Sequence, residues 1–550
     1  MNRRYAVTQL KNVPRRDLPA AVSTAAFLAA LLILSAFSSA CSTKKADMRD
    51  LAPADTLIYL ETNDLAGALQ PIIDSKPFID AATQRPDLSA LSGVQLAIAI
   101  TGFETKEERL TDEHSVGRVQ PRFVAVADTH AWNYQAVAFA EQKLGGFVER
   151  IYDSPPTLVK ANKSGGSYFT WTAKDGRKSF ALVIDSLIYF GNDESAIDKC
   201  LAVRRGEADS LAKAGKVRPS QPGTLASGYI GTDGVAQIAS VIGLKFASEA
   251  GEEAEVKSAI SSILPLLLRN SVTEISWTAE RTDQGIVDSY MVTMPPELVR
   301  VLNETMAPSD DPDRSLLNFV PDGASSITAY DLKDPQVAWR SVLLAARKQT
   351  DPTVGKAISE FTSIFFVPYG IGDPEMFLSS VNHFLVTVKC DAEGEKPAVI
   401  ATSRNITQTE RSMLKDLLPV KEKRSEDGEV RMTNDNDLTA LLKGNRIAIG
   451  DSDCVGRINA EDIFMNGRPR VRDEVFLKQL RSNTAPITSL GSDTTSAGQI
   501  AEVMATKRSD SVIRPSAYFT ETRFTGTGME RKTTSDFGFV GWIIAQLSED

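Results

Sequence analysis

The stretches Leu51–Leu65, LAPADTLIYLETNDL, and Phe319–Leu332, FVPDGASSITAYDL, decide how this chain can fold. Each passes from a proline and turn-forming residues into a short apolar run typical of a β-strand, and then into Asp-Leu before a periodic segment. Asp64 and Asp331 are suitable helix N-caps, because a carboxylate accepts hydrogen bonds from the free N–H groups of the first turn. The helices expected after them span 65–75 and 336–349.

The same order of elements continues after both stretches. Each is followed by two apolar strands, a helix, a strand that ends in glycine and an acid, and a hairpin with period-two alternation. Ordinary alternation of strands and helices is the alternative explanation of this match. The matched segments are Val94–Thr101 and Phe123–Asp128 with Phe384–Cys390 and Ala398–Thr402, Asn133–Leu144 with Gln408–Leu418, Ser186–Asp193 with Gly444–Asp451, and Thr273–Met294 with Ser516–Phe537.

The pattern predicts an α+β fold built from two tandem copies of a mainly antiparallel-sheet unit with packed helices. The first copy is expected at 51–306, with a helical insert at about 235–269, and the second at 315–550. An acidic, proline-rich linker, 307–314, separates them. Each copy has an ordinary domain size.

The N-terminus is typical of an export signal. Residues 1–40 contain basic residues first, then an apolar run from Ala20 to Phe37, and then Ser38, Ser39 and Ala40. This order is characteristic of a secretory signal peptide. We therefore expect a signal peptide at 1–40 and a polar tether at 41–50.

Cys41 resembles the lipidated cysteine of bacterial lipoproteins. Ser39, Ala40 and Cys41 match that pattern, whereas Ser38 departs from it, since leucine usually precedes the cysteine by three residues. Cleavage without lipidation and an uncleaved apolar anchor are the alternatives. All three interpretations place the folded body outside the cytoplasm of a bacterium. Lipidation and an uncleaved anchor also attach it to a membrane.

Charge excludes nucleic acid as a partner. The 550-residue chain has a net charge of −10; residues 1–40 contribute five basic side chains and one acidic one, so the part from Cys41 onward carries −14. A body this acidic is repelled by phosphate backbones and by anionic headgroups. The expected partner is the membrane itself, through the N-terminal anchor, and any protein or apolar ligand is unknown.

The sequence offers no cofactor or metal site. With Cys41 lipidated, Cys200, Cys390 and Cys454 allow at most one disulfide and leave one thiol. The three histidines and the spacing of the cysteines do not suit zinc. There is no Walker A sequence and no dinucleotide-binding glycine motif after a strand.

The segment Pro53–Asp64, together with Tyr189–Asp193, resembles a family of exported bacterial proteins of unknown function whose domain opens with Pro-Ala-Asp-Thr and a short strand. The resemblance implies an envelope-located, often anchored protein. It implies no activity and no catalytic residues.

Three segments partly match known catalytic or metal-binding patterns. Asp451–Asp462 partly fits a calcium loop, but Val455 and Asp462 do not, so we interpret it as a polar turn and helix start. Asp128-Thr129-His130 follows a strand, yet no Gly-x-Ser-x-Gly nucleophile is present, so we interpret it as a capped turn with an exposed histidine. Ser42–Lys45 matches Ser-x-x-Lys only in its letters.

No catalytic residue is therefore assigned. The preferred function is a non-catalytic binding or scaffolding module at a membrane. The alternatives are an extracytoplasmic hydrolase that uses scattered acids and a carrier of apolar molecules. The carrier would use the leucine-rich segment Ile263–Leu268.

Overall fold

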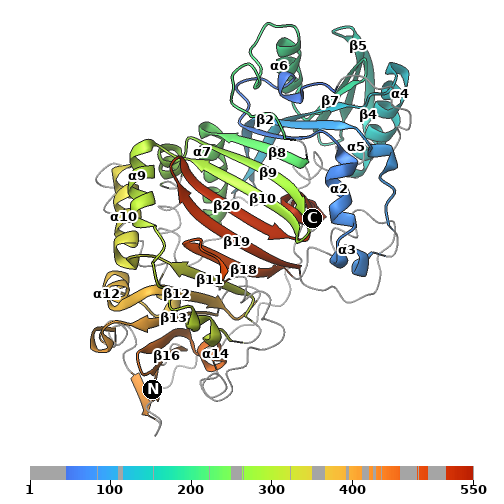
Figure 1. Ribbon diagram of the computed structural model, residues 1–550. Helices are drawn as coiled ribbons and strands as arrows, with labels where there is room; N and C mark the ends of the chain where they lie inside the picture. The colour runs from blue at the N-terminus through green and yellow to red at the C-terminus, as the bar shows by residue number, and fades with distance from the viewer. Residues whose placement is uncertain are drawn as a thin grey trace, which may run out of the picture.

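The structure is a computed structural model with an α+β fold organised around one extended antiparallel sheet (Figure 1). We call residues 45–305 the N-terminal half and 314–548 the C-terminal half. The described residues are 45–82, 85–109, 115–152, 154–221, 223–248, 263, 265–321, 324–349, 366–391, 396–409, 411, 420–424, 429–434, 437–458, 480, 482–493 and 516–548.

Within the described residues, ten strands form the sheet of the N-terminal half, and all of their pairings are antiparallel. Across the sheet their order is β4-β5-β6-β7-β3-β2-β1-β8-β9-β10. They are β1 (Ile58–Thr62), β2 (Gln95–Arg109), β3 (Ser115–Asp128), β4 (Thr157–Lys163), β5 (Gly166–Thr172), β6 (Lys178–Ile184), β7 (Leu187–Gly191), β8 (Thr224–Gly231), β9 (Glu274–Thr282) and β10 (Gly285–Thr293).

Ten described strands likewise form the sheet of the C-terminal half. Their order is β14-β15-β16-β17-β13-β12-β11-β18-β19-β20, and β20 pairs with β10 to join the two halves. They are β11 (Ser326–Asp331), β12 (Val381–Lys389), β13 (Pro397–Ser403), β14 (Val420–Arg424), β15 (Glu429–Asn434), β16 (Leu438–Lys443), β17 (Arg446–Asp451), β18 (Ile487–Asp493), β19 (Ser516–Thr525) and β20 (Gly528–Ser535).

Sequence patterning explains which strands are covered on both faces. The start of β2 is a continuous apolar run in which Leu96 and Ile98 belong to one core cluster, while Ala97 and Ala99 belong to another on the opposite face. In β9, by contrast, the apolar residues alternate with polar ones, so Trp277 and Ala279 are buried while the residues between them are more exposed. A strand between two helical layers is apolar throughout, whereas a strand with one open face alternates.

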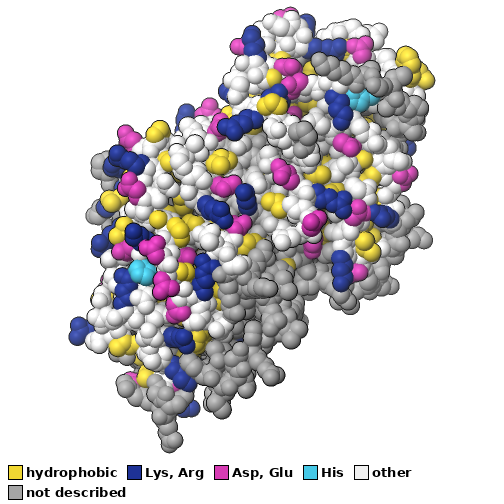
Figure 2. All heavy atoms as spheres, in the orientation of Figure 1, with side chains coloured by type: hydrophobic (Ala, Val, Ile, Leu, Met, Phe, Trp, Pro, Cys, Tyr) yellow, Lys and Arg dark blue, Asp and Glu magenta, His cyan; other side chains and the backbone are white. Residues whose placement is uncertain are grey.

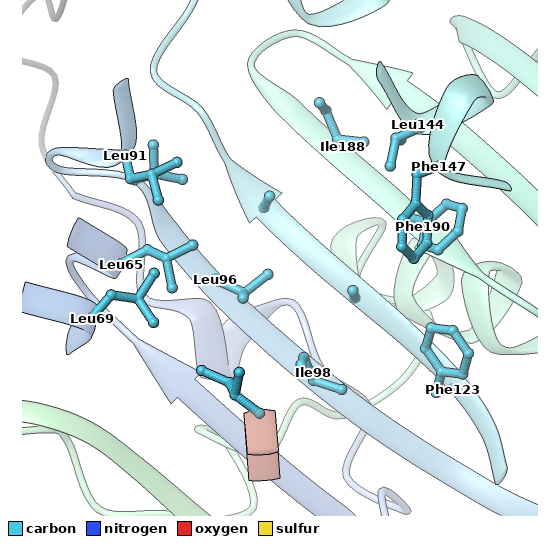
Figure 3. Packing of buried hydrophobic residues seen from close by; sticks show 14 of the residues in the cluster. Leu65, Leu69, Leu91, Leu96, Ile98, Phe123, Leu144, Phe147, Ile188 and Phe190 are labelled. Atoms are coloured by element: carbon cyan, nitrogen blue, oxygen red, sulfur yellow. The ribbon is translucent and has the colours of Figure 1, made fainter. Parts of the chain in front are cut away.

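Helices of the N-terminal half pack on both faces of its sheet. The larger core lies beneath α2 (Leu65–Ile73), α3 (Lys76–Ala81), α4 (Asn133–Phe139) and α5 (Gly145–Ile151), and the opposite core lies beneath α6 (Glu194–Arg204) and the 3-10 turn η1 (Met48–Asp50). Figure 3 shows Leu65 and Leu69 of α2 pointing toward Leu96 and Ile98 of β2. Each fully buried leucine or isoleucine of this kind contributes about 1.5–3 kcal/mol.

Helical segments also pack around the sheet of the C-terminal half. They are the 3-10 turns η4 (Arg314–Phe319) and η6 (Val367–Tyr369), and the helices α10 (Pro335–Lys348), α12 (Pro374–Ser380) and α14 (Ser452–Gly456). A disulfide between Cys390, after β12, and Cys454, in α14, ties one end of this sheet. A further helix, α7 (Thr232–Ser248), packs on β8 and β9 near the junction of the halves.

The helix that ends each half crosses to the other half. After β10, α9 (Pro296–Thr305) packs on β19 and α10. After β20, α18 (Gly538–Ser548) packs on β10 and α2. The strand pair β10–β20 and the two crossing helices therefore join the halves through backbone hydrogen bonds and side-chain packing.

Several sequence predictions are confirmed at the level of single elements, and others are wrong. The helices expected after the two opening stretches are α2 and α10, and the two predicted hairpins are β9–β10 and β19–β20. The N-cap of α10, however, is Asp334 and not Asp331. Leu332 and Lys333 lie between the two aspartates, so the helix begins later than predicted. Asp64 occupies the N-cap of α2, but its side chain makes no capping hydrogen bond to the first turn of the helix. Its carboxylate accepts a hydrogen bond from the Gly93 backbone N–H.

The tether predicted at 41–50 is shorter than expected. The Ala46 backbone is hydrogen-bonded to Gln95, and Met48 is buried. The folded body therefore begins by Ala46. The predicted linker also lies against the C-terminal half, since the Ala307 carbonyl accepts a hydrogen bond from the Lys333 N–H and Ser309 donates to Asp331. The helix predicted at Gln408–Leu418 lies mostly outside the described residues.

Candidate functional site

The candidate site is a cleft of about 530 Å³ at one end of the N-terminal sheet. We call it the cationic cleft, because three basic side chains, Arg122, Arg177 and Lys178, face two acidic ones, Glu104 and Asp193. The lining comes from β2, β3, the end of α5, the start of β6 and the β7–α6 connection. The other residues named below as part of it are Phe123, Tyr152, Ser179, Phe180, Phe190 and Asn192.

Arg122 is the basic residue of the cleft with the loosest ion pairs. Its guanidinium lies 3.7 Å from a Glu104 oxygen and 4.0 Å from an Asp193 oxygen, both beyond hydrogen-bonding distance. The Arg122 side chain is about half exposed. A planar guanidinium in this position can turn toward an incoming carboxylate or phosphate and donate two parallel hydrogen bonds.

Arg177 and Tyr152 also line the cleft and contact each other. The Arg177 guanidinium stacks over the Tyr152 ring, 5.0 Å from its centroid, and also pairs with Asp175 at 2.6 Å. The Tyr152 hydroxyl lies 2.7 Å from the Ser179 hydroxyl. Burial raises the pKa of Tyr152, so this hydroxyl stays protonated at neutral pH and is a hydrogen-bond donor.

The β7–α6 connection fixes the rim of the cleft. Gly191 ends β7, and a Cβ there would collide with the Phe123 carbonyl oxygen, so β7 can approach β3 this closely only with glycine. The Asn192 side chain accepts from the Phe123 N–H and donates to the Pro121 carbonyl. Asp193 is the N-cap of α6 and accepts from the Ser195 backbone N–H at 3.1 Å.

Aromatic rings lie beneath the polar rim. Phe190 is buried and makes contacts with Phe123, Phe147 and Trp171 at centroid distances of 6.3, 6.3 and 6.5 Å. Phe180 is only partly buried and stacks on Tyr168. Of these lining rings, Phe180 is therefore the one with surface for a ligand to contact, since Phe123 and Phe190 are buried.

This arrangement is suited to binding an organic anion, because the lining includes three basic side chains and both of its acids are already engaged. The Asp193 carboxylate already accepts hydrogen bonds at the N-terminus of α6, and both acids face arginine. Among the described residues, no group of three or more His, Cys, Asp or Glu side chains is placed to hold a metal ion.

A second, smaller pocket lies at the junction of the halves beside α18. Its volume is about 280 Å³, and its lining includes Asp288, Tyr290, Arg531 and Trp542. Asp288 is only 2% exposed and accepts hydrogen bonds from the Trp277 indole N–H at 2.9 Å and the Phe539 N–H at 2.7 Å. Burial raises the pKa of Asp288 to about 6. One oxygen of this carboxylate thus holds the start of α18, and the other holds the Trp277 side chain of β9.

The predicted turn Asp128-Thr129-His130 forms part of neither pocket. Asp128 accepts from the His130 backbone N–H at 3.1 Å, as expected for a capping aspartate, and its carboxylate lies 3.4 Å from the His130 ring nitrogen Nδ1. The His130 side chain is about 10% exposed, so the expectation of an exposed histidine is wrong. The loop folds back on Ser186, whose carbonyl accepts from Thr129.

The segment beginning at Asp451 is a polar turn and helix start, as predicted. Asp451 caps α14 by accepting from the backbone N–H groups of Asp453 and Cys454, and Asp453 pairs with Lys396 and Arg457. The end of the proposed loop, residues 459–462, lies outside the described residues.

The cysteines follow the predicted count of one disulfide and one remaining thiol. Cys390 and Cys454 are bonded, and Cys200 is free and buried in α6. Burial raises the pKa of the Cys200 thiol to about 12, so it stays protonated and unreactive. Cys41 and Ser42 lie outside the described residues, and Lys45 is an exposed residue at their border.

The predicted apolar-carrier segment lines neither pocket. Within Ile263–Leu268, residues 263 and 265–268 are helical, Leu266 is 40% exposed, and Leu268 packs against a small core that includes Val272. No helix within the described residues is long and apolar enough to span a membrane.

The cleft residues were not identified from the sequence. Arg122 is separated from Arg177 by 55 positions, and only strand pairing brings β3, β6 and β7 together. The signal that could have revealed part of the site is the turn Asp175-Gly176 between two runs of apolar and aromatic residues, which is typical of a hairpin.

Comparison with known proteins adds little. No family model matches the chain, and no curated protein matches it. A solved structure described as crystal form IV of TP0453 matches 43% of this chain and 96% of its own, with 8% identity and a TM-score of 0.22. A similarity this low carries no argument, so the resemblance to exported proteins of unknown function stays a prediction.

Proposed function

We propose that this chain is a non-catalytic binding protein of the bacterial cell envelope, anchored to a membrane through Cys41, and that it takes a small organic anion in the cationic cleft. The observation that carries the proposal is Arg122. Its guanidinium lines a 530 Å³ cleft, its side chain is about half exposed, and its ion pairs with Glu104 and Asp193 are long. A loosely paired cation in a cleft that is also lined by Phe180 and Tyr152 is suited to a ligand with both a negative charge and an apolar part.

We also propose that the two halves are tandem copies of one unit. In support, the first ten strands and the second ten are ordered alike, with β1 at the place of β11 and so on through β10 and β20. The α2 helix follows β1 as α10 follows β11. Ordinary alternation of strands and helices does not require the same order of ten strands.

The junction supports the same proposal. Gly285 lies opposite Thr282 in one hairpin and Gly528 lies opposite Thr525 in the other, so the two glycines hold equivalent positions. Ser289 and Lys532 each follow their glycine by four residues, and they face each other in the β10–β20 ladder. Two equivalent positions that pair with each other define a local two-fold axis, and the reciprocal crossing of α9 and α18 fits that axis.

Two observations support export and anchoring. The Cys390–Cys454 disulfide is typical of an oxidising compartment outside the cytoplasm. The folded body begins by Ala46, so only a few residues separate it from Cys41.

A binding measurement tests the ligand proposal. Isothermal titration of the full chain with acetate, inorganic phosphate, benzoate and phenyl phosphate should show the aromatic anions binding most tightly, because they use both the rim and the rings. Arg122→Ala should weaken that binding about tenfold or more. Lys396→Ala is the matched control. Lys396 lies two residues before Ala398, which pairs with Gly450, as Arg122 lies two residues before Val124, which pairs with Gly191, and Lys396 is paired with Asp453. Equal weakening by both variants, or no binding of any of the four anions, would contradict the proposal.

The anchor has a separate test. The intact mass of the chain from the membrane fraction should correspond to a start at Cys41 with acyl groups attached, and Cys41→Ser should move the chain to the soluble fraction. Cys200→Ser, which changes a buried thiol, should leave the distribution unchanged. An unmodified N-terminal Cys41 would rule out lipidation.

A further inference from the structure

We infer that Trp132 and Tyr134, at the start of α4, rest in the headgroup region of the bilayer to which Cys41 is attached. We call these two residues and the loop 129–131 before them the aromatic corner. The inference rests on the proposed anchoring at Cys41 and adds a contact surface between the folded body and the lipid.

The chain enters the folded body at the same end of the sheet as this corner, although Ala46 packs on one face and α4 on the other. The Ala46 N–H donates to the Gln95 side chain at 3.0 Å, and the Gln95 amide donates back to the Ala46 carbonyl at 2.8 Å. Gln95 is the first residue of β2 and lies opposite Asp128, the last residue of β3. Trp132 follows Asp128 by four residues, a chain length of at most about 14 Å.

The short spacer keeps this end of the body near the membrane. Five residue steps join Cys41 to Ala46. At about 3.3–3.6 Å per residue, they span at most about 18 Å when fully extended. An acylated Cys41 lies at the bilayer surface, so the end of the sheet that contains Gln95 and Asp128 cannot move far from it.

Both aromatic side chains point into solvent although the backbone under them is fixed. Trp132 is 65% exposed and Tyr134 is 70% exposed. Figure 2 shows hydrophobic side chains at the corner of the molecule where Figure 1 places α4. The Trp132 N–H donates to the Gln135 side chain, and the Asn133 amide donates to the Asp185 carbonyl.

The loop before them is held in the same way. The Thr129 N–H and hydroxyl both donate to the Ser186 carbonyl, and the Ala131 N–H donates to the Thr129 hydroxyl. A fixed backbone presents the two rings at one place and lowers the entropy cost of burying them against another surface.

The chemistry of the corner favours a lipid surface. Tryptophan and tyrosine combine an apolar ring with a polar tip, and they gather where membrane meets water. The body from Cys41 onward carries −14, so attraction to anionic headgroups is not the cause of the contact. We therefore expect the contact to form on electrically neutral lipid and to be insensitive to salt.

Fluorescence quenching tests this arrangement. The full chain, purified from the membrane fraction, is placed in phosphatidylcholine vesicles with or without bromine on the acyl chains. Brominated lipid should quench part of the tryptophan emission. Trp132→Phe should abolish that quenching, whereas Trp542→Phe, which removes another half-exposed tryptophan at the junction pocket, should leave it unchanged. Hydrogen exchange should also slow at 129–134 when the unmodified chain joins vesicles.

The outcomes separate the contact from the anchor. Binding to the vesicles is checked by co-flotation in a density gradient. If the chain co-floats with the vesicles, and the quenching is lost in Trp132→Phe but not in Trp542→Phe, the inference is supported. A chain that floats but shows no quenching from Trp132 and no slowed exchange at 129–134 overturns it and leaves the anchor standing. Protection of 129–134 in native membranes but not in pure lipid vesicles would assign the corner to a protein partner and overturn the lipid contact. A chain that does not float overturns both proposals.

Discussion

The β7–α6 end of the N-terminal half and the β17–α14 end of the C-terminal half share a backbone plan but differ at the rim. Gly191 is the last residue of β7 and Gly450 is the last but one of β17, and both strands pair so closely with their neighbours that a Cβ at either glycine would collide with a carbonyl oxygen, of Phe123 or Pro397. In each case an aspartate then caps a helix. At the first end a cleft opens beside Arg122.

The second end is closed by covalent and ionic links. The Cys390–Cys454 disulfide joins β12 to α14, and Arg457 donates to the Cys390 carbonyl at 3.1 Å. Lys396 and Arg457 both pair with Asp453, at 2.8 and 3.0 Å. The close strand contact is therefore compatible with an open cleft and with a closed, cross-linked end. The side chains at the rim decide which of the two forms.

Removing the disulfide should have the largest effect on stability. The bonded cysteines are separated by 64 positions, so the chain-entropy estimate for the loop predicts a loss of about 4 kcal/mol in the free energy of unfolding when both become serine. Urea denaturation measures it. Reductant should destabilise the unmodified chain by the same amount and leave the double variant unchanged. A simultaneous loss of anion binding in the cationic cleft would show that the two ends are not independent.

The acid under α18 should give the next largest effect. The pKa of Asp288 rises from an ordinary 3.8 to about 6 in the native state, so the native chain binds this proton more tightly than the unfolded chain does. Stability should therefore fall as pH rises from about 4 to above 6, by about 3 kcal/mol in total.

Asp288→Asn should remove this pH dependence, because the amide cannot titrate. The comparison is made by urea denaturation of both chains across that pH range. Parallel curves of unfolding free energy against pH for the two chains would show that Asp288 titrates normally. Burial of its charged carboxylate would then not lower the stability of the native state.

Adding a methyl group at the two glycines where the strands approach closely tests whether the two ends share one backbone plan. Gly191→Ala and Gly450→Ala should each cost about 2 kcal/mol, since the added methyl group would force a strand away from a carbonyl oxygen. Gly146→Ala is a suitable control because it lies inside α5 with open space around it, and it should stabilise the chain by about 0.5–1 kcal/mol. A large cost at one strand end and none at the other would break the comparison.

The smallest effect is expected at the rim charges. Arg122→Ala and Lys396→Ala should each change the free energy of unfolding by less than about 1 kcal/mol, because their ion pairs are exposed to solvent. Thermal unfolding of the two variants would measure this. A loss of several kcal/mol for Arg122→Ala would give Arg122 a structural role and weaken its assignment as the ligand-binding residue.

The sequence predicted elements best where apolar runs or clear alternation mark them. The strands before α2 and α10 and the two hairpins at the junction belong to this group. The strands β4, β5 and β6 were missed although Gly165 and Gly176 mark both turns between them with positive φ values. Five of the seven side chains of β4 are exposed and none is fully buried, so its sequence lacks the alternation of apolar and polar residues that marks a half-buried strand.

The missed strands β8 and β18 have a different cause. β8, TLASGYIG, contains small residues that give weak periodicity, and it is held by β1 and β9 on either side. Its partners lie far from it in the sequence, so no local pattern reveals the pairing. The crossing of α9 and α18 was missed for the same reason, because an apolar helix face does not specify which half covers it.

By itself the sequence determined the α+β class, the positions of most strongly patterned elements and the number of cysteines available for a disulfide, because these depend on local periodicity and on counting. The tertiary structure alone decided the pairing of Cys390 with Cys454, the joining of β10 to β20 and the meeting of Arg122 with Arg177 in one cleft. These features depend on contacts between residues far apart in the chain. Such contacts are selected by packing and backbone hydrogen bonding across the whole sheet.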